Sequence, residues 1–386
     1  MIPLSVPNMC GDELVNIKEC IDTGWLSTSG KFVTLFEEKI SKFVGSKYAI
    51  ACNNGTAALQ ISLKLIGVIP GDEVIVPSLT FIAPINAIIY NSAKPIFMDC
   101  DNFYNIDIKK TIEFIKVETI FKNGFTYNKK TKNRISAIIP VHVWGNAVWL
   151  DELVRVCNER NIYILEDASE SIGTTYTEGN YKGKHAGTIG RIGCLSFNAN
   201  KIMTTGGGGM ILTNDSEIAK KALYLITQAK DDPIKYIHNE VGYNYRLTNL
   251  HAAIGVSQID RLSSFVKYKK KIHQKYISEL NHIGGLNIVS TPGYSNNNYW
   301  LNILQIDLDS IGKTLDNIIE IFDKNEIQTR PVWHLNHLQK QFTSFQSYKI
   351  SNANSLLKNS ICIPSGSNLS LKDQTKVINV IKNLNI

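Results

Sequence analysis

The chain has 386 residues, 44% of them hydrophobic, and a formal net charge of +7. This length is enough for one large domain and a smaller one. No apolar stretch is long enough to span a bilayer, and the first residues lack the basic, apolar and cleavage regions of a signal peptide. We therefore expect a cytoplasmic protein with no membrane partner.

Charge and cysteine content argue against two further classes of protein. Much of the positive excess lies in the short runs 123–134 and 267–271, which favours solvated loop or helix faces over a nucleic-acid surface. The seven cysteines are scattered and form no CxxC pair. They predict reduced thiols and no metal site.

Strands alternate with helices along the first part of the chain. Residues 48–52 read as a buried strand, 53–56 as its turn, and 57–67 as a helix that ends at a glycine. Further short β-rich runs follow at 71–77, 94–101, 135–143, 161–169, 192–198 and 208–215. This alternation predicts an α/β fold, in which helices cover both faces of a mainly parallel, seven-stranded sheet.

The pattern changes near residue 250. A long helical stretch occupies 249–280, a strand follows at 299–308, and an amphipathic helix at 314–327. We therefore predict a large α/β domain over residues 1–249 and a smaller α+β domain over 250–386.

Polar signals fall where strands end, the place where α/β sheets bind ligands. Asn54, Gly55 and Thr56 lie between a strand and a helix start, where free N–H groups and the helix dipole favour an anion such as phosphate. Glu166 and Asp167 end an apolar strand. Ordinary helix capping is an alternative explanation for both signals.

A single lysine stands in the stretch SFNANKIMTTGGGGM, residues 196–210, which contains no carboxylate to neutralise it. A phosphate-binding P-loop places its lysine after the glycines, whereas Lys201 precedes Gly206–Gly209. A lysine in a pocket of small residues can act as an amine nucleophile. A lysine that extends from an apolar surface into water is the alternative for such a residue taken alone.

The three signals together match the needs of pyridoxal phosphate. Its phosphate needs donors, its pyridine nitrogen needs a carboxylate, and its aldehyde needs an amine. Nearly the whole chain resembles the DegT/DnrJ/EryC1/StrS sugar aminotransferases, of the fold-type-I aminotransferase superfamily. The matching stretches include GWLSTSGKFVTLFEEKIS, NNGTAALQISL, GDEVIVPSLTFIAPINAI, VHVWG, EDASES, SFNANKIMTTGGGGMILTND and GYNYRLTNLHAAIGVSQ. The opening residues further resemble the branch that makes amino sugars for legionaminic-type acids.

This resemblance implies a role for each matched residue. Lys201 would bind the cofactor aldehyde, and Asp167 would pair with the pyridine nitrogen. Phe81 would lie against the ring, and Glu170 near its 3-hydroxyl, where many members carry Gln or His. Gly55, Thr56 and Ser196 would hold the phosphate, with Asn244 reaching it from the partner subunit of a homodimer. Trp333 and His334 would help to shape the sugar pocket, and His142 would support the site or the core.

The resemblance implies transfer of the amino group of L-glutamate to C4 of a nucleotide-linked 4-keto-6-deoxy sugar, for a surface glycan. The favoured substrate is a 2-acetamido-2,6-dideoxy-hexos-4-ulose on UDP or GDP. Amination at C3 and a non-catalytic regulator that binds pyridoxal phosphate remain alternatives. A related dehydratase would carry histidine in place of Lys201, and Cys194 lies in a strand, which suits packing better than the chemistry of a desulfurase.

Overall fold

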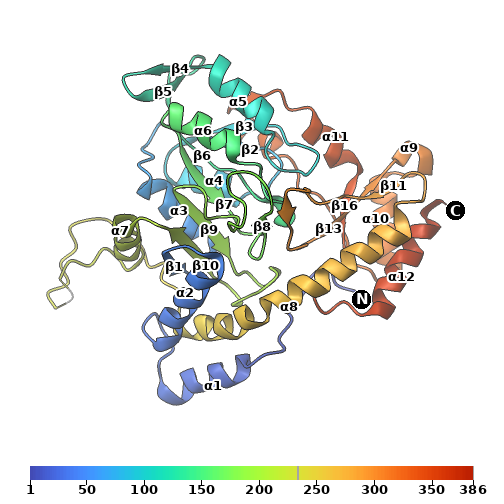
Figure 1. Ribbon diagram of the computed structural model, residues 1–386, viewed down its shortest axis with the longest axis horizontal. Coiled ribbons are helices and arrows are strands. Elements are labelled where there is room, and N and C mark those ends of the chain that lie inside the picture. Colours follow the sequence, from blue (N-terminus) through green and yellow to red (C-terminus); the bar gives the residue numbers. More distant parts are fainter. Residues whose placement is uncertain (233, 386) are drawn as a thin grey trace.

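The computed structural model describes residues 1–232 and 234–385 and is built around one twisted sheet (Figure 1). Its strands follow the order β1-β10-β9-β7-β6-β2-β3-β15. Neighbours from β9 to β15 run parallel, whereas β10 is antiparallel to both β9 and β1. The seven longer strands are β1 (Tyr48–Cys52), β2 (Glu73–Pro77), β3 (Lys94–Met98), β6 (Arg134–Ile138), β7 (Tyr163–Asp167), β9 (Ile192–Ser196) and β10 (Gly209–Thr213). They form the predicted mainly parallel sheet.

Helices cover both faces of this sheet because successive side chains on a strand point to opposite sides. In β2, Val74 and Val76 join one apolar cluster while Ile75 joins another. The first cluster lies under α2 (Lys31–Val44), α3 (Gly55–Leu65), α4 (Ala83–Tyr90) and α7 (Ser216–Ile226), and the second under α5 (Ile108–Val117) and α6 (Asp151–Glu159).

One basic run differs in part from its prediction. Residues 123–134 were expected to be a solvated loop or helix face, and Lys129, Lys130 and Lys132 do lie exposed in a turn. The run also includes β5 (Phe125–Asn128), which pairs with β4 (Thr119–Lys122) and with β6. The alternation of Phe125 and Tyr127 with threonine and asparagine suits a strand. This hairpin and the two-residue β15 (Ser347–Tyr348) extend the sheet beyond its seven longer strands.

The long helix α8 (Asn249–Leu280) links the sheet to the C-terminal layer, crossing the molecule diagonally (Figure 1). Its first half packs against α1 (Glu13–Thr23) and α2, and its second half against α12 (Leu371–Lys382). The C-terminal residues have their own sheet, order β11-β13-β16-β14, and their own apolar cluster. The division into domains at residue 250 stays a prediction; α8 begins at Asn249.

The remaining elements are short or belong to the C-terminal layer. They are β8 (Thr175–Tyr176), β11 (Leu286–Ile288), β12 (Ser295–Asn296), β13 (Asn302–Ile306), α9 (Leu308–Ile311), α10 (Leu315–Lys324), β14 (Arg330–Pro331), α11 (Asn352–Asn359) and β16 (Ser360–Ile363), with single 3-10 turns at Val143–Gly145, Asn336–Leu338 and Asn383–Asn385. The strand predicted at 299–308 corresponds to β13, and the helix predicted at 314–327 corresponds to α10.

Candidate functional site

A cavity of about 300 Å³ opens at the carboxyl ends of β7 and β9, beside the N-terminus of α3. It brings together side chains that lie far apart in the sequence. Its lining includes eight of the predicted site residues: Gly55, Thr56, Phe81, Asp167, Glu170, Ser196, Lys201 and Trp333. The tertiary fold therefore gathers the predicted phosphate, carboxylate and amine groups in one place.

Lys201 lies in the loop after β9, and its side chain is 13% exposed. Its Nζ lies 4.1 Å from the ring centroid of Trp300 and 3.6 Å from Oε1 of Glu170. The stretch around Lys201 contains no carboxylate, but the fold brings one from the loop after β7. The amine is therefore paired with a carboxylate that the local sequence does not reveal.

The two carboxylates at the end of β7 have different surroundings because neighbours on a strand face opposite ways. Glu166 is fully buried and accepts hydrogen bonds from His142 (2.9 Å) and from the N–H groups of Gly187 (2.9 Å), Ile189 (2.6 Å) and Gly190 (2.5 Å). Burial acts to raise its pKa, but these bonds hold the pKa of Glu166 below its ordinary value. Glu166 is thus a buried structural anion.

Asp167 faces the cavity instead. It is 4% exposed, and its Oδ1 accepts the N–H of Ser169 at 3.0 Å. Burial raises the pKa of Asp167, while the bonds from Ser169 and the charge of Lys201 oppose that rise. A cationic ring nitrogen in the cavity would restore the charged carboxylate.

His142 supports this strand end from behind, in agreement with its expected role. It is fully buried, and its Nδ1 accepts the N–H of Val148 at 3.0 Å. Its other nitrogen, Nε2, must then carry the proton that it donates to Glu166. The imidazole is therefore fixed as one neutral tautomer and lies outside the cavity lining.

The N-terminus of α3 forms the opposite wall. Asn54 caps the helix by accepting the N–H of Ala57, and the earlier N–H groups of the first turn have no intrahelical partner. A Cβ on Gly55 would lie 2.9 Å from the Cβ of Ser196, so the helix approaches β9 closely only because residue 55 is glycine. The result is a cradle of N–H groups and hydroxyls suited to a phosphate.

Aromatic side chains surround the rest of the opening. Phe81 is 53% exposed, and its ring centroid lies 6.5 Å from that of Trp333. Trp333 in turn stacks on Trp144 at 5.1 Å. The hydroxyl of Thr80, also in the lining, is buried without a hydrogen-bond partner among the described residues.

Two predicted residues lie outside this lining. His334 is exposed, next to Trp333, and Asn244 is exposed at a backbone bridge to Thr227. Asn244 comes after a segment that follows α7. In Figure 1 this segment extends away from the central sheet. That segment also exposes Ile234, Tyr236 and Val241.

Several lining residues were not predicted, and Trp300 is the most important. It belongs to the segment between β12 and β13, and its indole N–H donates to the carbonyl of Asn200 at 2.8 Å, which ties it to the lysine loop. The run NNNYW before β13 does not mark Trp300 as a site residue, because an aromatic residue beside a strand is most simply interpreted as part of the hydrophobic core. Further unpredicted lining residues are Ser169, Asn198, Asn200 and Thr80.

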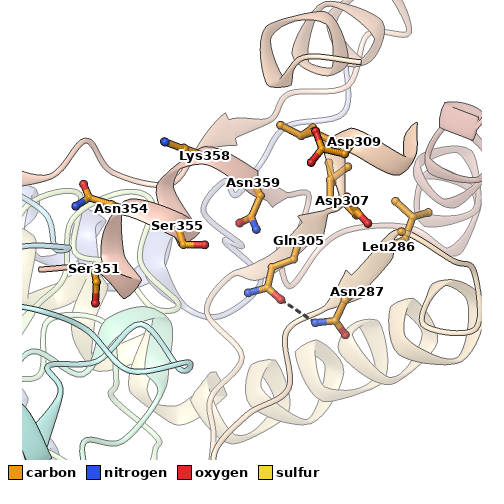
Figure 2. A pocket seen from close by; sticks show the side chains of 13 residues that line it. Leu286, Asn287, Gln305, Asp307, Asp309, Ser351, Asn354, Ser355, Lys358 and Asn359 are labelled. Carbon is orange, nitrogen blue, oxygen red and sulfur yellow. Dashed lines mark hydrogen bonds between the residues drawn. The ribbon is translucent and has the colours of Figure 1, made fainter. Parts of the chain in front are cut away.

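A second, wider groove of about 860 Å³ lies between β11, the end of β13 and α11 (Figure 2). Its polar groups largely bond to one another or cap helices: Asn287 donates to Gln305 at 2.8 Å, and Asp307 caps α9. Figure 2 shows Lys358 pointing away from Asp307 and Asp309. This groove thus lacks the paired amine and carboxylates of the first cavity.

Comparisons with known proteins show which family this chain resembles. Residues 7–382 match the DegT/DnrJ/EryC1/StrS aminotransferase family. The chain is 34% identical to a GDP-perosamine synthase of Caulobacter vibrioides over 98% of its length and 96% of the relative, and 33% identical to one of Vibrio cholerae over 99% of both. A crystal structure of a DegT DnrJ EryC1 StrS aminotransferase from Brucella abortus has a TM-score of 0.87 and 25% identity, with 97% of this chain and 95% of that one covered.

No helix within residues 1–232 and 234–385 is both long and apolar enough to cross a membrane. The same residues contain no cluster of histidine, cysteine and acidic side chains that could hold a metal ion.

Proposed function

This chain belongs to the DegT/DnrJ/EryC1/StrS family of pyridoxal phosphate-dependent sugar aminotransferases, and on that premise we propose its reaction. It transfers the amino group of L-glutamate to C4 of a nucleotide-linked 4-keto-6-deoxy sugar. The observation that carries this proposal is the convergence of Lys201 and Asp167 in one cavity beside the N-terminus of α3. An aminotransferase needs an amine, a carboxylate and a phosphate cradle in this arrangement.

The residues present fit pyridoxal phosphate. Gly55 and Thr56 in the first turn of α3 and Ser196 at the end of β9 would hold the phosphate, and Thr80 offers a hydroxyl that is unpaired among the described residues. Asp167 would hold a proton on the pyridine nitrogen, which also offsets the cost of burying that carboxylate. Phe81 would lie against the ring face. When bound, the cofactor supplies an aldehyde and a ring that accepts electrons.

The side chains of this protein then bind substrates and move protons. Lys201 would hold the cofactor and, once released by the amino donor, take a proton from its Cα and later return one to the sugar. Trp300 keeps the amine at one side of the cavity. The aromatic pair Phe81 and Trp333 would exclude water from the reacting atoms and pack against the sugar.

We propose that the sugar is a 2-acetamido-2,6-dideoxy-hexos-4-ulose linked to UDP or GDP, on the route to a legionaminic-type acid of a surface glycan. Support comes from the resemblance of the N-terminal residues to that branch. Two relatives named GDP-perosamine synthases support a nucleotide-linked sugar in general.

We also propose that the active sites are shared in a homodimer. Asn244 is exposed and lies outside the cavity of its own chain, which is what a residue serving a neighbouring subunit requires. The segment before it exposes Ile234, Tyr236 and Val241, which are costly to leave in water. An isologous dimer would bury these side chains of both subunits at its interface.

A panel of UDP- and GDP-linked 4-keto-6-deoxy sugars, with L-glutamate as donor, tests the reaction. Mass spectrometry of the product shows whether an amino group has been added, and NMR shows its position. We expect amination at C4, with the 2-acetamido sugars turned over most efficiently, and no product from Lys201→Ala. Amination at C3 would reject the proposed position, and binding of cofactor without turnover of any sugar would favour the regulator.

A further inference from the structure

Glu170 is held rigidly beside Lys201. Its Oε2 accepts the backbone N–H of Trp144 at 2.7 Å, and its backbone carbonyl accepts the side-chain amide of Asn298 at 2.8 Å. Trp144 has an unusual backbone conformation for a large residue, with φ of 53°, and in this conformation its N–H points at Oε2 of Glu170. One carboxylate oxygen is therefore fixed, and the other, Oε1, faces Nζ of Lys201 at 3.6 Å.

Among the described residues, few charged groups surround Lys201 and Glu170. Lys201 is faced by Glu170 and by Asp167, with the Trp300 ring against its nitrogen. Glu170 is faced by Lys201, by Asp167 and by the buried thiol of Cys362, from β16. Behind Asp167, the neutral imidazole of His142 and the carboxylate of Glu166 satisfy each other. If Asp167 serves the pyridine nitrogen, Glu170 is the carboxylate left to pair with Lys201.

From this arrangement we propose that Glu170 sets the protonation of the Lys201 nitrogen, as its counter-ion and as its proton acceptor. This inference rests on the proposed function. The carboxylate favours the protonated nitrogen by charge pairing. When that nitrogen must react, its N–H bond breaks, the electron pair stays on nitrogen, and the proton forms an O–H bond with Oε1, so no further reactant is needed.

The burial of Glu170 suits both roles. Burial raises the pKa of Glu170 to about 7, against the lowering effect of the Lys201 charge and of the Trp144 N–H. A carboxyl group with such a pKa can gain and lose a proton at working pH. Glutamine at this position could accept the Trp144 bond but could neither carry a charge nor take a proton.

The test is a pH titration of the cofactor-loaded enzyme without amino donor, followed by its absorbance spectrum. Wild type is compared with Glu170→Gln, with Glu170→Asp, and with Glu178→Gln, which removes an exposed carboxylate elsewhere as a control. We expect the midpoint of the spectral change to fall by about 1 to 3 pH units in Glu170→Gln, because the opposite charge is gone. Glu170→Asp should show a smaller fall, and Glu178→Gln none.

Borohydride reduction followed by peptide mass analysis identifies the residue that carries the cofactor in each protein. An adduct on Lys201 with an unchanged or higher midpoint in both Glu170 variants would overturn the role of Glu170 while leaving the proposed function intact. An adduct on no lysine, or on another lysine, would overturn the proposed function and this inference with it. Should Glu170→Gln fail to fold, an unshifted midpoint in Glu170→Asp would be sufficient to reject the proposal.

Discussion

Replacing Glu166 by glutamine should destabilise the fold much more than its small chemical change suggests. In the wild type, Oε1 accepts the N–H groups of Ile189 and Gly190, and Oε2 accepts those of Gly187 and His142. The single oxygen of glutamine can serve one of these two pairs of donors. Its amide nitrogen, itself a donor, would face the other pair.

His142 cannot adapt by changing its tautomer, because its Nδ1 already accepts the N–H of Val148. Two buried donors are therefore left unpaired, each at a cost of about 1–3 kcal/mol. The expected loss in the free energy of unfolding is about 2–6 kcal/mol. The matched control is Asp167→Asn, in which the amide oxygen can still accept the Ser169 N–H, so stability should change by less than about 1 kcal/mol.

Urea unfolding followed by far-ultraviolet circular dichroism, at one protein concentration and without added cofactor, measures both variants. Because the pKa of Glu166 is lowered in the folded state, its stabilisation is present above its ordinary pKa of 4.5 and is lost as the pH falls through the folded value. The difference between wild type and Glu166→Gln should thus narrow below pH 4.5. Equal unfolding midpoints at pH 7 would refute the assignment of Glu166 as a structural anion.

Three further predictions concern the cavity. Lys201→Ala should still bind pyridoxal phosphate, as shown by equilibrium dialysis, but lose turnover; transamination at the wild-type rate would remove Lys201 from the chemistry. Asp167→Asn should slow both half-reactions by about 10²-fold or more in stopped-flow absorbance, and near-normal rates at saturating cofactor would exclude contact with the pyridine nitrogen. Lys201→Ala and Asn244→Asp homodimers should each be impaired, whereas differently tagged, co-purified mixed dimers should regain activity, because one site carries both defects and the other neither. Mixed dimers no better than the average of their parents would contradict the shared site.

Much of the fold was predictable because its signals are local. The predicted runs 48–52 and 161–169 formed the strands β1 and β7 (Tyr163–Asp167), and Gly67 was expected to end a helical stretch, which the structure ends at Leu65. The basic run 123–134 was read correctly for its lysines, which are exposed in the turn between β5 and β6, but the strand β5 within the run was not predicted. Composition alone does not locate so short a strand.

The cofactor was also predictable from the sequence. The order of Gly55 and Thr56, Asp167, Ser196 and Lys201 along the chain indicates the cofactor, since each requirement of pyridoxal phosphate has its own residue type. These residues lie at strand ends or helix starts, which topology places at one edge of the sheet. Local pattern and fold class were therefore enough to predict that the residues would lie together.

Only the tertiary structure shows which carboxylate lies beside the lysine. The sequence offers Glu166, Asp167 and Glu170 within five residues, and nothing in their order says that the first is buried among backbone N–H groups while the third lies 3.6 Å from Lys201. Trp300 likewise comes from a segment about a hundred residues away, tied to the lysine loop by a hydrogen bond to Asn200. Burial and charge pairing depend on distance in space, which sequence separation does not encode, so the protonation of this site is a property of the folded chain.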